Sequence, residues 1–278
     1  VMIMYGWITE TSILAAFLST LGPGLIITAL FCIINMVSAK KFDLVLEEPR
    51  PFNEQVKVTI KRAWVAIPAL LMPVIILGGI YGGVFTPTEA AAVSAIYALP
   101  VGFFIYKAMK PKEFFDMTVE SSSAIGSIMT MIIFCLMLSQ TFVMLQVPQA
   151  IIKMFLGVTT SKTLILIIIN LFLFVVGMIV NDTTGMILVA PLLLPLALEL
   201  GIHPVHFGAI MGVNLAMGGV TPPYASILYL GMRIGKCEFK DIFGPTMAFL
   251  IFGYVPIVFL TTFVPELSLF IPRLFGLI

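Results

Sequence analysis

The chain has 278 residues, of which 60% are hydrophobic and only 10% are charged, and its formal net charge is +1. A soluble domain of this length needs far more charged residues on its surface, so the composition predicts a polytopic, all-α membrane protein. The near-neutral charge gives no indication of nucleic-acid binding. The three cysteines are widely spaced and form no C-x-x-C pair, which indicates neither a disulfide framework nor a metal site.

Apolar windows of about 20 residues predict five membrane spans. They lie near residues 12–37, 63–83, 88–106, 117–145 and 245–265. Six of the fifteen Lys and Arg residues fall in the loop over residues 38–62, namely Lys40, Lys41, Arg50, Lys57, Lys61 and Arg62. This loop is therefore predicted to be cytoplasmic. Following the spans alternately places residues 107–116 inside, and residues 146–162 and the C-terminus outside.

Residues 82–89 read Gly-Gly-Val-Phe-Thr-Pro-Thr-Glu and precede an Ala-rich stretch. Thr86 suits the N-cap of a helix, Pro87 its first position and Glu89 its third, which together make a capping box. The motif is therefore interpreted as structural.

A first polar interruption, Asn181-Asp182-Thr183-Thr184-Gly185, lies inside an otherwise apolar region. Asp182 is the only carboxylate deep within an apolar run, and an ionised group there is costly and usually functional. The neighbouring amide and hydroxyls add neutral oxygens. Sodium and other hard cations bind such oxygens, together with carbonyls freed where a helix unwinds. The alternative is a helix cap in a water-exposed turn, since Asp and Thr are favoured N-caps.

Residues 161–200 can form either two crossings or a re-entrant hairpin, and both return residue 200 to the outside. The second arm, residues 186–200, is short for a span and carries Pro191, Pro195 and Glu199. A re-entrant hairpin with its tip at residues 181–185 is therefore predicted.

A second interruption follows in the helix that His203-Pro204 opens. This helix runs through Asn214 and reaches Gly218-Gly219-Val220-Thr221-Pro222-Pro223. Two glycines and two prolines in six residues predict a broken membrane helix that resumes at Tyr224, with Thr221 and freed carbonyls available as ligands. The alternative is a proline kink with packing glycines. His203 and His206 are spaced to hold a metal, but without further Cys or His nearby they indicate a helix start.

A weak internal repeat supports this organisation. Tyr229-Leu230-Gly231 followed by Gly244-Pro245 is similar to Met4-Tyr5-Gly6 followed by Gly22-Pro23, and each pair leads into a long apolar span. We therefore expect residues 1–10 to be the end of a first-repeat broken helix, and a first hairpin to precede the chain.

Three motifs together resemble one known family, the large membrane (M) subunit of the tripartite ATP-independent periplasmic (TRAP) transporters. They are Gly83-Val84-Phe85-Thr86-Pro87-Thr88-Glu89-Ala90-Ala91-Ala92, His203-Pro204-Val205-His206-Phe207-Gly208, and Asn214-Leu215-Ala216 followed by Thr221-Pro222-Pro223. The resemblance covers essentially the whole chain. It implies an elevator-type secondary transporter with inverted repeats in the bacterial inner membrane, driven by sodium as the coupling ion. It also implies two partners, a small membrane (Q) subunit and a periplasmic binding protein that delivers an organic acid.

The resemblance also implies a division of the chain and a set of site residues. Residues 11–160 are expected to form scaffold and connecting-arm helices, residues 161–235 a transport domain (hairpin 161–200, broken helix 204–235), and residues 236–278 a C-terminal scaffold helix. The expected sodium ligands are Asn181, Asp182, Thr183, Thr184, Gly218, Thr221 and Pro222. The expected substrate contacts are Asn214, Thr184 and Ser226.

Many relatives have Pro-Pro-Val-Gly where this chain has Pro222-Pro223-Tyr224-Ala225. The departure falls beside the expected substrate site, and a sialic acid or similar sugar acid is favoured over a C4-dicarboxylate. Two other functions stay open, an ion channel built on the same broken helices and a non-transporting membrane assembly subunit. An enzyme is not expected, because the sequence has no P-loop, G-x-S-x-G or H-E-x-x-H motif.

Overall fold

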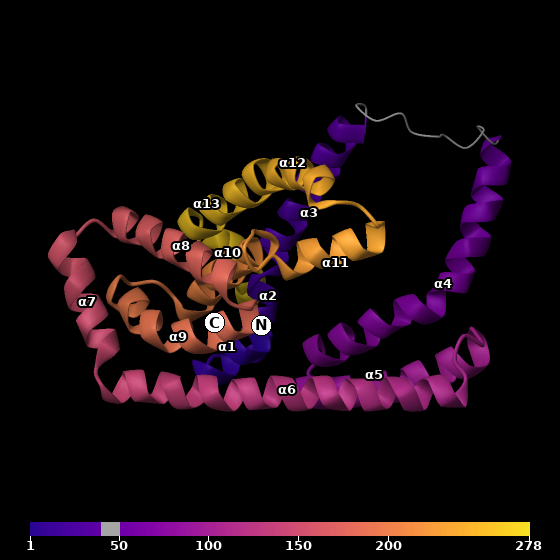
Figure 1. The fold of residues 1–278 in the computed structure, drawn as a ribbon, viewed down its shortest axis with the longest axis horizontal. Coiled ribbons are helices and arrows are strands. Elements are labelled where there is room, and N and C mark those ends of the chain that lie inside the picture. Colours follow the sequence, from indigo (N-terminus) through magenta and orange to yellow (C-terminus); the bar gives the residue numbers. More distant parts are fainter. Residues whose placement is uncertain (40–50) are drawn as a thin grey trace. The chain divides into compact units, whose positions relative to one another are not determined.

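The computed structural model describes residues 1–39 and 51–278, and every regular element in those residues is a helix (Figure 1). Contacts divide the chain into two units, Val1–Phe42 with Met129–Ile278, and Asp43–Ile128. Of the basic residues predicted to mark a cytoplasmic loop, Lys40, Lys41 and Arg50 lie outside the described residues. The others belong to the first turns of a long helix in the smaller unit.

Residues 51–128 of the smaller unit form helices. They are α4 (Phe52–Tyr81), α5 (Pro87–Pro100), the π-helical turn η1 (Val101–Ile105) and the first part of α6 (Pro111–Met144). Helices α4 and α5 pack against each other. The predicted capping box is confirmed, since the Thr86 amide donates to the Glu89 carboxylate over 2.8 Å and the Glu89 amide to the Thr86 hydroxyl over 3.3 Å. The Tyr106 hydroxyl donates to the Val65 carbonyl over 2.7 Å and links η1 to α4.

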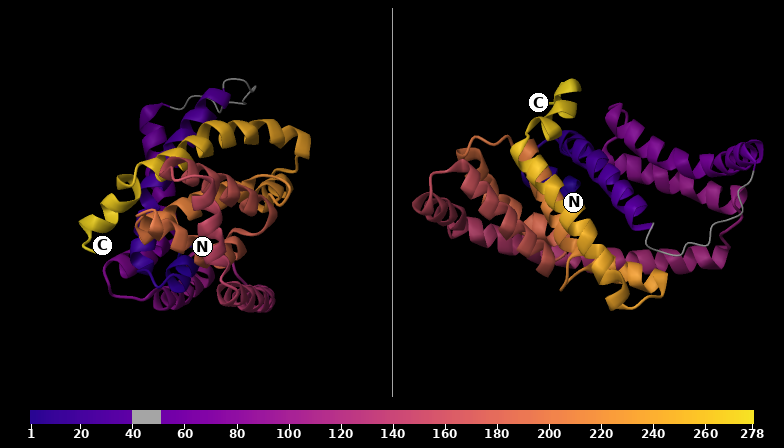
Figure 2. Two further views of the ribbon diagram at one scale, coloured as in Figure 1. Left: turned by 90° about the vertical axis from the view of Figure 1, so that its left-hand side faces the viewer. Right: turned by 90° about the horizontal axis from the view of Figure 1, so that it is seen from above.

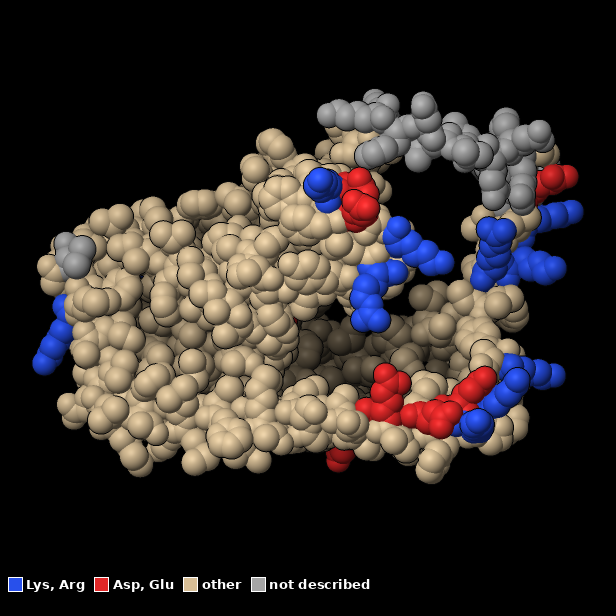
Figure 3. Space-filling view, in the orientation of Figure 1, with Lys and Arg blue, Asp and Glu red and all other residues tan. Residues whose placement is uncertain are grey.

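Seven helical segments in the described residues are long and apolar enough to cross a membrane. They are Ile13–Ala39, Val56–Tyr81, Pro87–Ile105, Pro111–Met144, Lys162–Ile179, Asp182–Glu199 and Phe239–Phe263. Five of them confirm the predicted spans, and the other two fall in the region where a hairpin is predicted. The face shown in Figure 3 is covered mainly by uncharged side chains over α8, α9 and α13, as expected of a surface that meets lipid.

The larger unit is built around α10 (Pro204–Val220), which packs against α8 (Lys162–Ile179), α9 (Asp182–Glu199), α2 (Ile13–Ser19) and α13 (Val255–Phe263). Phe207, Ile210, Met211 and Leu215 of α10 are fully buried. The remaining elements are α1 (Met2–Ile8), α3 (Leu21–Ala39), the end of α6, α7 (Val147–Val158), α11 (Ser226–Gly235), α12 (Phe239–Phe249), η2 (Leu250–Tyr254) and α14 (Glu266–Leu274).

Small residues let neighbouring helices approach α10 closely, as is usual in membrane proteins. A Cβ atom at Gly208 would lie 2.5 Å from the ring of Tyr5, whose hydroxyl donates to the Pro204 carbonyl over 2.6 Å. Helix α1 is thereby held to the first turn of α10.

The first interruption is shorter than predicted. Asn181 caps α9 by accepting a hydrogen bond from the Thr183 amide over 2.9 Å, so the helix begins at Asp182 rather than after Gly185. The prediction of an irregular segment through Gly185 was wrong, because Asp and Thr are as favourable in the first turn of a helix as in a loop. The second arm therefore has 18 residues, and its predicted shortness no longer favours a re-entrant hairpin. A hairpin over residues 161–200 stays a prediction.

The second interruption is confirmed, with different edges. Helix α10 includes both Gly218 and Gly219 and ends at Val220, and α11 begins at Ser226 rather than at Tyr224. Ala225, just before α11, has a φ of 35°, a left-handed conformation that alanine rarely adopts.

The C-terminal span is one rod made of α12, η2 and α13, drawn in yellow in Figure 2. The π-helical turn of η2 contains Gly253, and a Cβ atom at this residue would lie 2.5 Å from the ring of Phe31 in α3. The unit also contains residues 11–39 and 129–160, which the sequence-based division assigned to the scaffold, together with the predicted transport segment 161–235.

Candidate functional site

The two helix interruptions meet in the folded chain. The backbone amide of Tyr224, in the second interruption, donates to the Met178 carbonyl at the end of α8 over 3.0 Å. The Asn181 side-chain amide donates to the Tyr224 hydroxyl over 3.3 Å. Tyr224, in the second interruption, is therefore hydrogen-bonded both to the end of α8 and to the residue that caps α9, the two helices on either side of the first interruption.

A pair of glycines brings the backbones together just before these hydrogen bonds. A Cβ atom at Gly218 of α10 would lie 2.4 Å from the carbonyl carbon of Gly177 in α8. Both glycines are buried. Because only hydrogen fits at this contact, the end of α10 lies directly against the end of α8.

The predicted oxygen ligands of the first interruption are partly exposed at the start of α9. The carboxylate of Asp182 accepts a hydrogen bond from the Thr183 amide over 2.9 Å. The Thr184 hydroxyl donates to the Met131 sulfur over 3.0 Å. Asp182 is a negative charge at a helix N-terminus, where the positive end of the helix dipole favours it.

The predicted ligands of the second interruption have different environments. Thr221 is buried, and its hydroxyl donates to the Met217 carbonyl over 2.9 Å. Its amide donates to the Gly218 carbonyl over 2.8 Å. Pro222 is half-buried, whereas Ser226 is exposed on α11.

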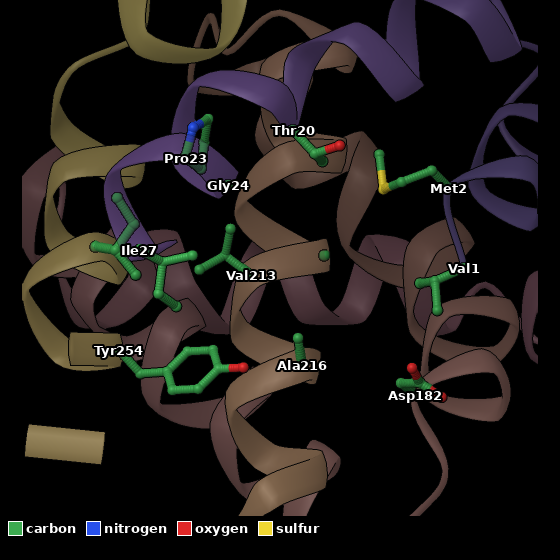
Figure 4. Close-up of a pocket in the computed structure, with 12 residues that line it drawn as sticks. Val1, Met2, Thr20, Pro23, Gly24, Ile27, Asp182, Val213, Ala216 and Tyr254 are labelled. Carbon is green, nitrogen blue, oxygen red and sulfur yellow. The ribbon is translucent and has the colours of Figure 1, made fainter. Parts of the chain in front are cut away.

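Asp182 also lines a cavity of about 290 Å³ that is formed by α1, α3, α9, α10 and the C-terminal rod (Figure 4). Val213 and Ala216 of α10 lie between Asp182 on one side and Tyr254 on the other. Most of the lining is apolar, with Asp182 as its carboxylate. The cavity therefore combines a mainly apolar wall with one carboxylate next to the helix interruptions.

Asn214, a predicted substrate contact, lies in a separate buried cluster. Its side-chain amide donates to the Asn170 side-chain oxygen and to the Ile210 carbonyl, both over 2.8 Å. The Thr262 hydroxyl donates to the same Asn170 oxygen over 3.1 Å. This cluster joins α8, α10 and α13 in the interior, and Asn214 itself is only 1% exposed.

The structure thus brings together Asn181, Gly218 and the residues around Tyr224. Asp182 faces the cavity, Asn214 faces the interior and Ser226 faces outward. The local sequence pattern does not indicate Gly177 or Met178, and Tyr224 stands out in it only as a departure from the family pattern. Each interruption has a glycine four positions upstream, namely Gly177 before Asn181 and Gly218 before Pro222. This shared spacing of small residues is the sequence signal that could have predicted the contact between the two glycines.

No group of three or more His, Cys, Asp or Glu side chains that could hold a metal occurs in the part of the chain that the structure describes. The nearby donors are hard oxygens from a carboxylate, an amide and hydroxyls. This chemistry suits an alkali cation and does not suit a transition metal.

Comparison with known families decides the class of protein. The sequence model of the tripartite ATP-independent periplasmic transporter, DctM component, matches residues 1–267. The chain belongs to this family. The DctM family assignment confirms the resemblance seen in the sequence.

Curated relatives of the DctM chain include permeases for different acids. The isethionate TRAP transporter permease protein DctMQ of Oleidesulfovibrio alaskensis is 33% identical over 96% of this chain and 42% of that protein. The sialic acid TRAP transporter large permease protein SiaM of Vibrio cholerae is 32% identical over 99% of this chain and 63% of that protein. The C4-dicarboxylate TRAP transporter large permease protein DctM of Pseudomonas aeruginosa is 31% identical over 100% of this chain and 64% of that protein.

The chain spans between 42% and 64% of the length of these three relatives. Its spanning helices and its family identify it as a multi-pass protein of the inner membrane. The relatives are transport permeases, which confirms the prediction that the chain is not an enzyme.

Proposed function

We propose that this DctM chain is part of a sodium-coupled secondary transporter that imports an organic acid. The observation that carries the proposal is the junction of the two helix interruptions beside a cavity lined by Asp182. Secondary transporters build ion and substrate sites from such discontinuous helices, because unwound backbone supplies ligands and free helix ends supply charge.

Sodium is the cargo that the donor set fits best. Asp182 supplies the negative charge, and Asn181, Thr183, Thr184, Thr221 and the carbonyls at Gly218 and Pro222 are the proposed oxygen donors. A sodium ion beside Asp182 compensates a charge that is costly at membrane depth. The junction at Tyr224 then orders the start of α9 against the second interruption. Without the cation the Asp182 carboxylate remains uncompensated, so movement of a carrier that lacks sodium is disfavoured.

The organic acid is proposed to bind at the same junction, with Thr184, Asn214 and Ser226 as candidate contacts. For Asn214 this requires an opening of the buried cluster with Asn170. A sialic acid or a related sugar acid is the proposed class, and a named sialic acid permease is among the relatives. The Tyr224 hydroxyl, which the common Pro-Pro-Val-Gly sequence lacks, adds a polar group suited to a hydroxylated substrate.

The proposal includes the tripartite assembly. A small membrane subunit and a periplasmic binding protein are the expected partners, since the family name itself denotes a tripartite periplasmic transporter. An elevator movement of residues 161–235 against the rest of the membrane domain is the proposed transport step.

The deciding experiment is uptake of labelled sialic acid into proteoliposomes that carry the complete membrane subunits. Uptake is measured with and without sodium and the cognate binding protein, and is then repeated with a panel of other organic acids. Uptake that needs both sodium and the binding protein supports the proposal. Ion current without uptake of any acid would establish a channel instead.

Tyr224→Phe tests the junction in the same assay, with Tyr229→Phe as its matched control. The Tyr229 hydroxyl donates to the exposed Pro223 carbonyl over 3.4 Å and does not touch the first interruption. Loss of the Asn181–Tyr224 hydrogen bond is expected to lower uptake several-fold, because a bond of this kind contributes about 1 kcal/mol. Equal uptake by both variants contradicts a role for Tyr224.

A further inference from the structure

A second cavity, of about 440 Å³, lies at the opposite end of α10 from the helix interruptions. It is formed by the starts of α8 and α10, the end of α13 and the C-terminal helix α14. Its inner wall includes the buried side chains of Leu166, His206, Thr262 and Leu269. On the predicted topology this end of the larger unit faces outside.

The rim of this cavity is basic. Lys162, His203 and Arg273 are exposed side chains that come from three different helical elements and line the same space. Arg273 forms an ion pair with Glu266 at 2.5 Å. The Glu266 carboxylate compensates the charge of the Arg273 guanidinium. The charge of Lys162 therefore leaves the rim of the cavity with a net positive charge.

The hydrogen bonds of the two histidines define what they offer to a ligand. The Nδ1 atom of His203 accepts from the Val205 amide over 3.2 Å, so neutral His203 carries its proton on Nε2 and donates from there. The Nε2 atom of His206 lies 2.8 Å from the Thr261 carbonyl and must donate to it. His206 therefore braces the floor, and His203 is the imidazole with a free donor.

Two helix N-termini add to the positive character of the cavity. Lys162 begins α8 and Pro204 begins α10, and both helices have at least 17 residues. Ser161, at the N-cap of α8, forms no side-chain capping hydrogen bond. The start of α8 favours anions through its unpaired amides and its dipole, whereas α10 contributes mainly through its dipole, because Pro204 has no N–H and the Val205 amide is bonded to His203.

We propose that this cavity is an oxyanion-binding site, separate from the helix junction, in which Lys162, Arg273 and His203 hold a carboxylate or a phosphate. Lys162 supplies the uncompensated charge, Arg273 supplies guanidinium N–H donors beyond the one that binds Glu266, and His203 supplies a directed donor. Apolar side chains such as Leu166, Phe263 and Leu269 line the rest of the cavity and accommodate an attached hydrocarbon. The anion comes from a dissolved acid or from a phospholipid headgroup, which share this chemistry.

The two histidines make the proposal directly measurable. They are the only histidines in the chain and both line this cavity, so a ¹⁵N-histidine NMR spectrum reports on the site alone. Burial, and then the charge of Arg273, lower the pKa of His203. A bound oxyanion reverses this effect, since a nearby negative charge favours the imidazolium form.

The experiment titrates the full chain in nanodiscs, with His203→Gln used to assign the signals. One arm adds sodium phosphate or sodium acetate to phosphatidylcholine nanodiscs, against sodium chloride at equal ionic strength. The other arm replaces phosphatidylcholine by phosphatidylglycerol without added anion. A rise in the pKa of His203 that saturates with the dissolved anion identifies a solution ligand, and a rise only with the anionic lipid identifies a headgroup.

Variants separate a site from a general surface effect. Lys162→Gln and Arg273→Gln are each expected to weaken the response about tenfold, as loss of a charge-assisted hydrogen bond does. Lys153→Gln, an exposed lysine on α7 outside the cavity, is the matched control and keeps the response. If Lys162→Gln fails to fold, Lys162→Arg is used in its place, because it keeps the charge and is expected to preserve binding.

No response of His203 in either arm overturns the proposal. An equal response in Lys162→Gln and Lys153→Gln also overturns it, because that result reflects surface potential alone. The measurement needs no transport, so its outcome is independent of the proposed sodium-coupled uptake.

Discussion

Replacement of Gly218 by alanine tests the contact that joins the two helix interruptions. The new Cβ atom would lie 2.4 Å and 2.5 Å from two backbone carbons of Gly177, and 2.8 Å from the Met178 nitrogen. Carbon atoms are in favourable contact only at about 3.5–4.0 Å, so α8 and α10 must separate by about 1 Å. No side-chain rotation can relieve the clash, because all three atoms belong to the backbone.

The separation has two costs. Overpacking at a close contact costs about 1–3 kcal/mol. Movement of α10 away from α8 also breaks the Tyr224–Met178 backbone hydrogen bond, which contributes about 1 kcal/mol. Together these losses predict a Tm at least about 4 °C lower for a chain of this size.

Gly219→Ala is the matched control, since Gly219 is the next residue of the same helix and is also buried. A Cβ atom there has no neighbour within 4 Å. This variant is expected to be as stable as the wild type, or more stable by about 0.5–1 kcal/mol through the higher helix propensity of alanine.

Thermal unfolding followed by circular dichroism, in one detergent and at one protein concentration, compares the three proteins. Equal Tm values for Gly218→Ala and Gly219→Ala would refute the reasoning, because the backbone contact would then tolerate a methyl group.

Three further predictions concern single residues. Asp182→Asn is expected to weaken the apparent sodium affinity of uptake about tenfold without loss of assembly. The exposed Glu199→Gln is the control. If Asp182→Asn shows the same sodium dependence as this control, Asp182 is not a ligand. Ala225→Gly relieves a left-handed alanine and is expected to stabilise the chain by about 1 kcal/mol, and an unchanged or lower thermal midpoint contradicts that strain. Burial and then Arg273 lower the pKa of His203, so the unfolded chain binds more protons below about pH 6.5 and stability falls as the pH is lowered. His203→Gln removes this contribution. The free energy of unfolding of the wild type and of this variant, compared at about pH 7.5 and pH 5.5, measures it. An equal pH dependence in the two proteins would contradict the prediction.

Hydropathy and capping rules were sufficient for much of the fold. The five predicted spans correspond to observed helices because apolar length is a property of sequence alone. The capping box at Thr86 was found for the same reason, since all of its groups lie within four residues.

The site was only partly predictable, because its geometry depends on contacts across the fold. Asp182 and Thr183 are equally suitable for a loop and for the first turn of a helix, and only the cap formed by Asn181 decides between them. The orientation of Asn214 depends on its partner Asn170, 44 residues away. Tyr224 joins the two interruptions through its own amide and hydroxyl, which no local pattern indicates.

The wide turn at η2 makes the C-terminal span unequally sensitive to residue count along its length. A π-helical turn carries about one residue more than an α-helical turn, so deletion of one residue there narrows the turn and leaves the following helix with the same angular orientation. The same deletion in α12 would instead rotate everything after it by about 100° around the helix axis. Tyr254 and Ile257 would leave the cavity, and Thr262 would leave Asn170. For the α-helical parts of this rod the phase of the helix is therefore as strictly encoded as its hydrophobicity, whereas the wide turn is the place where the loss of one residue disturbs it least.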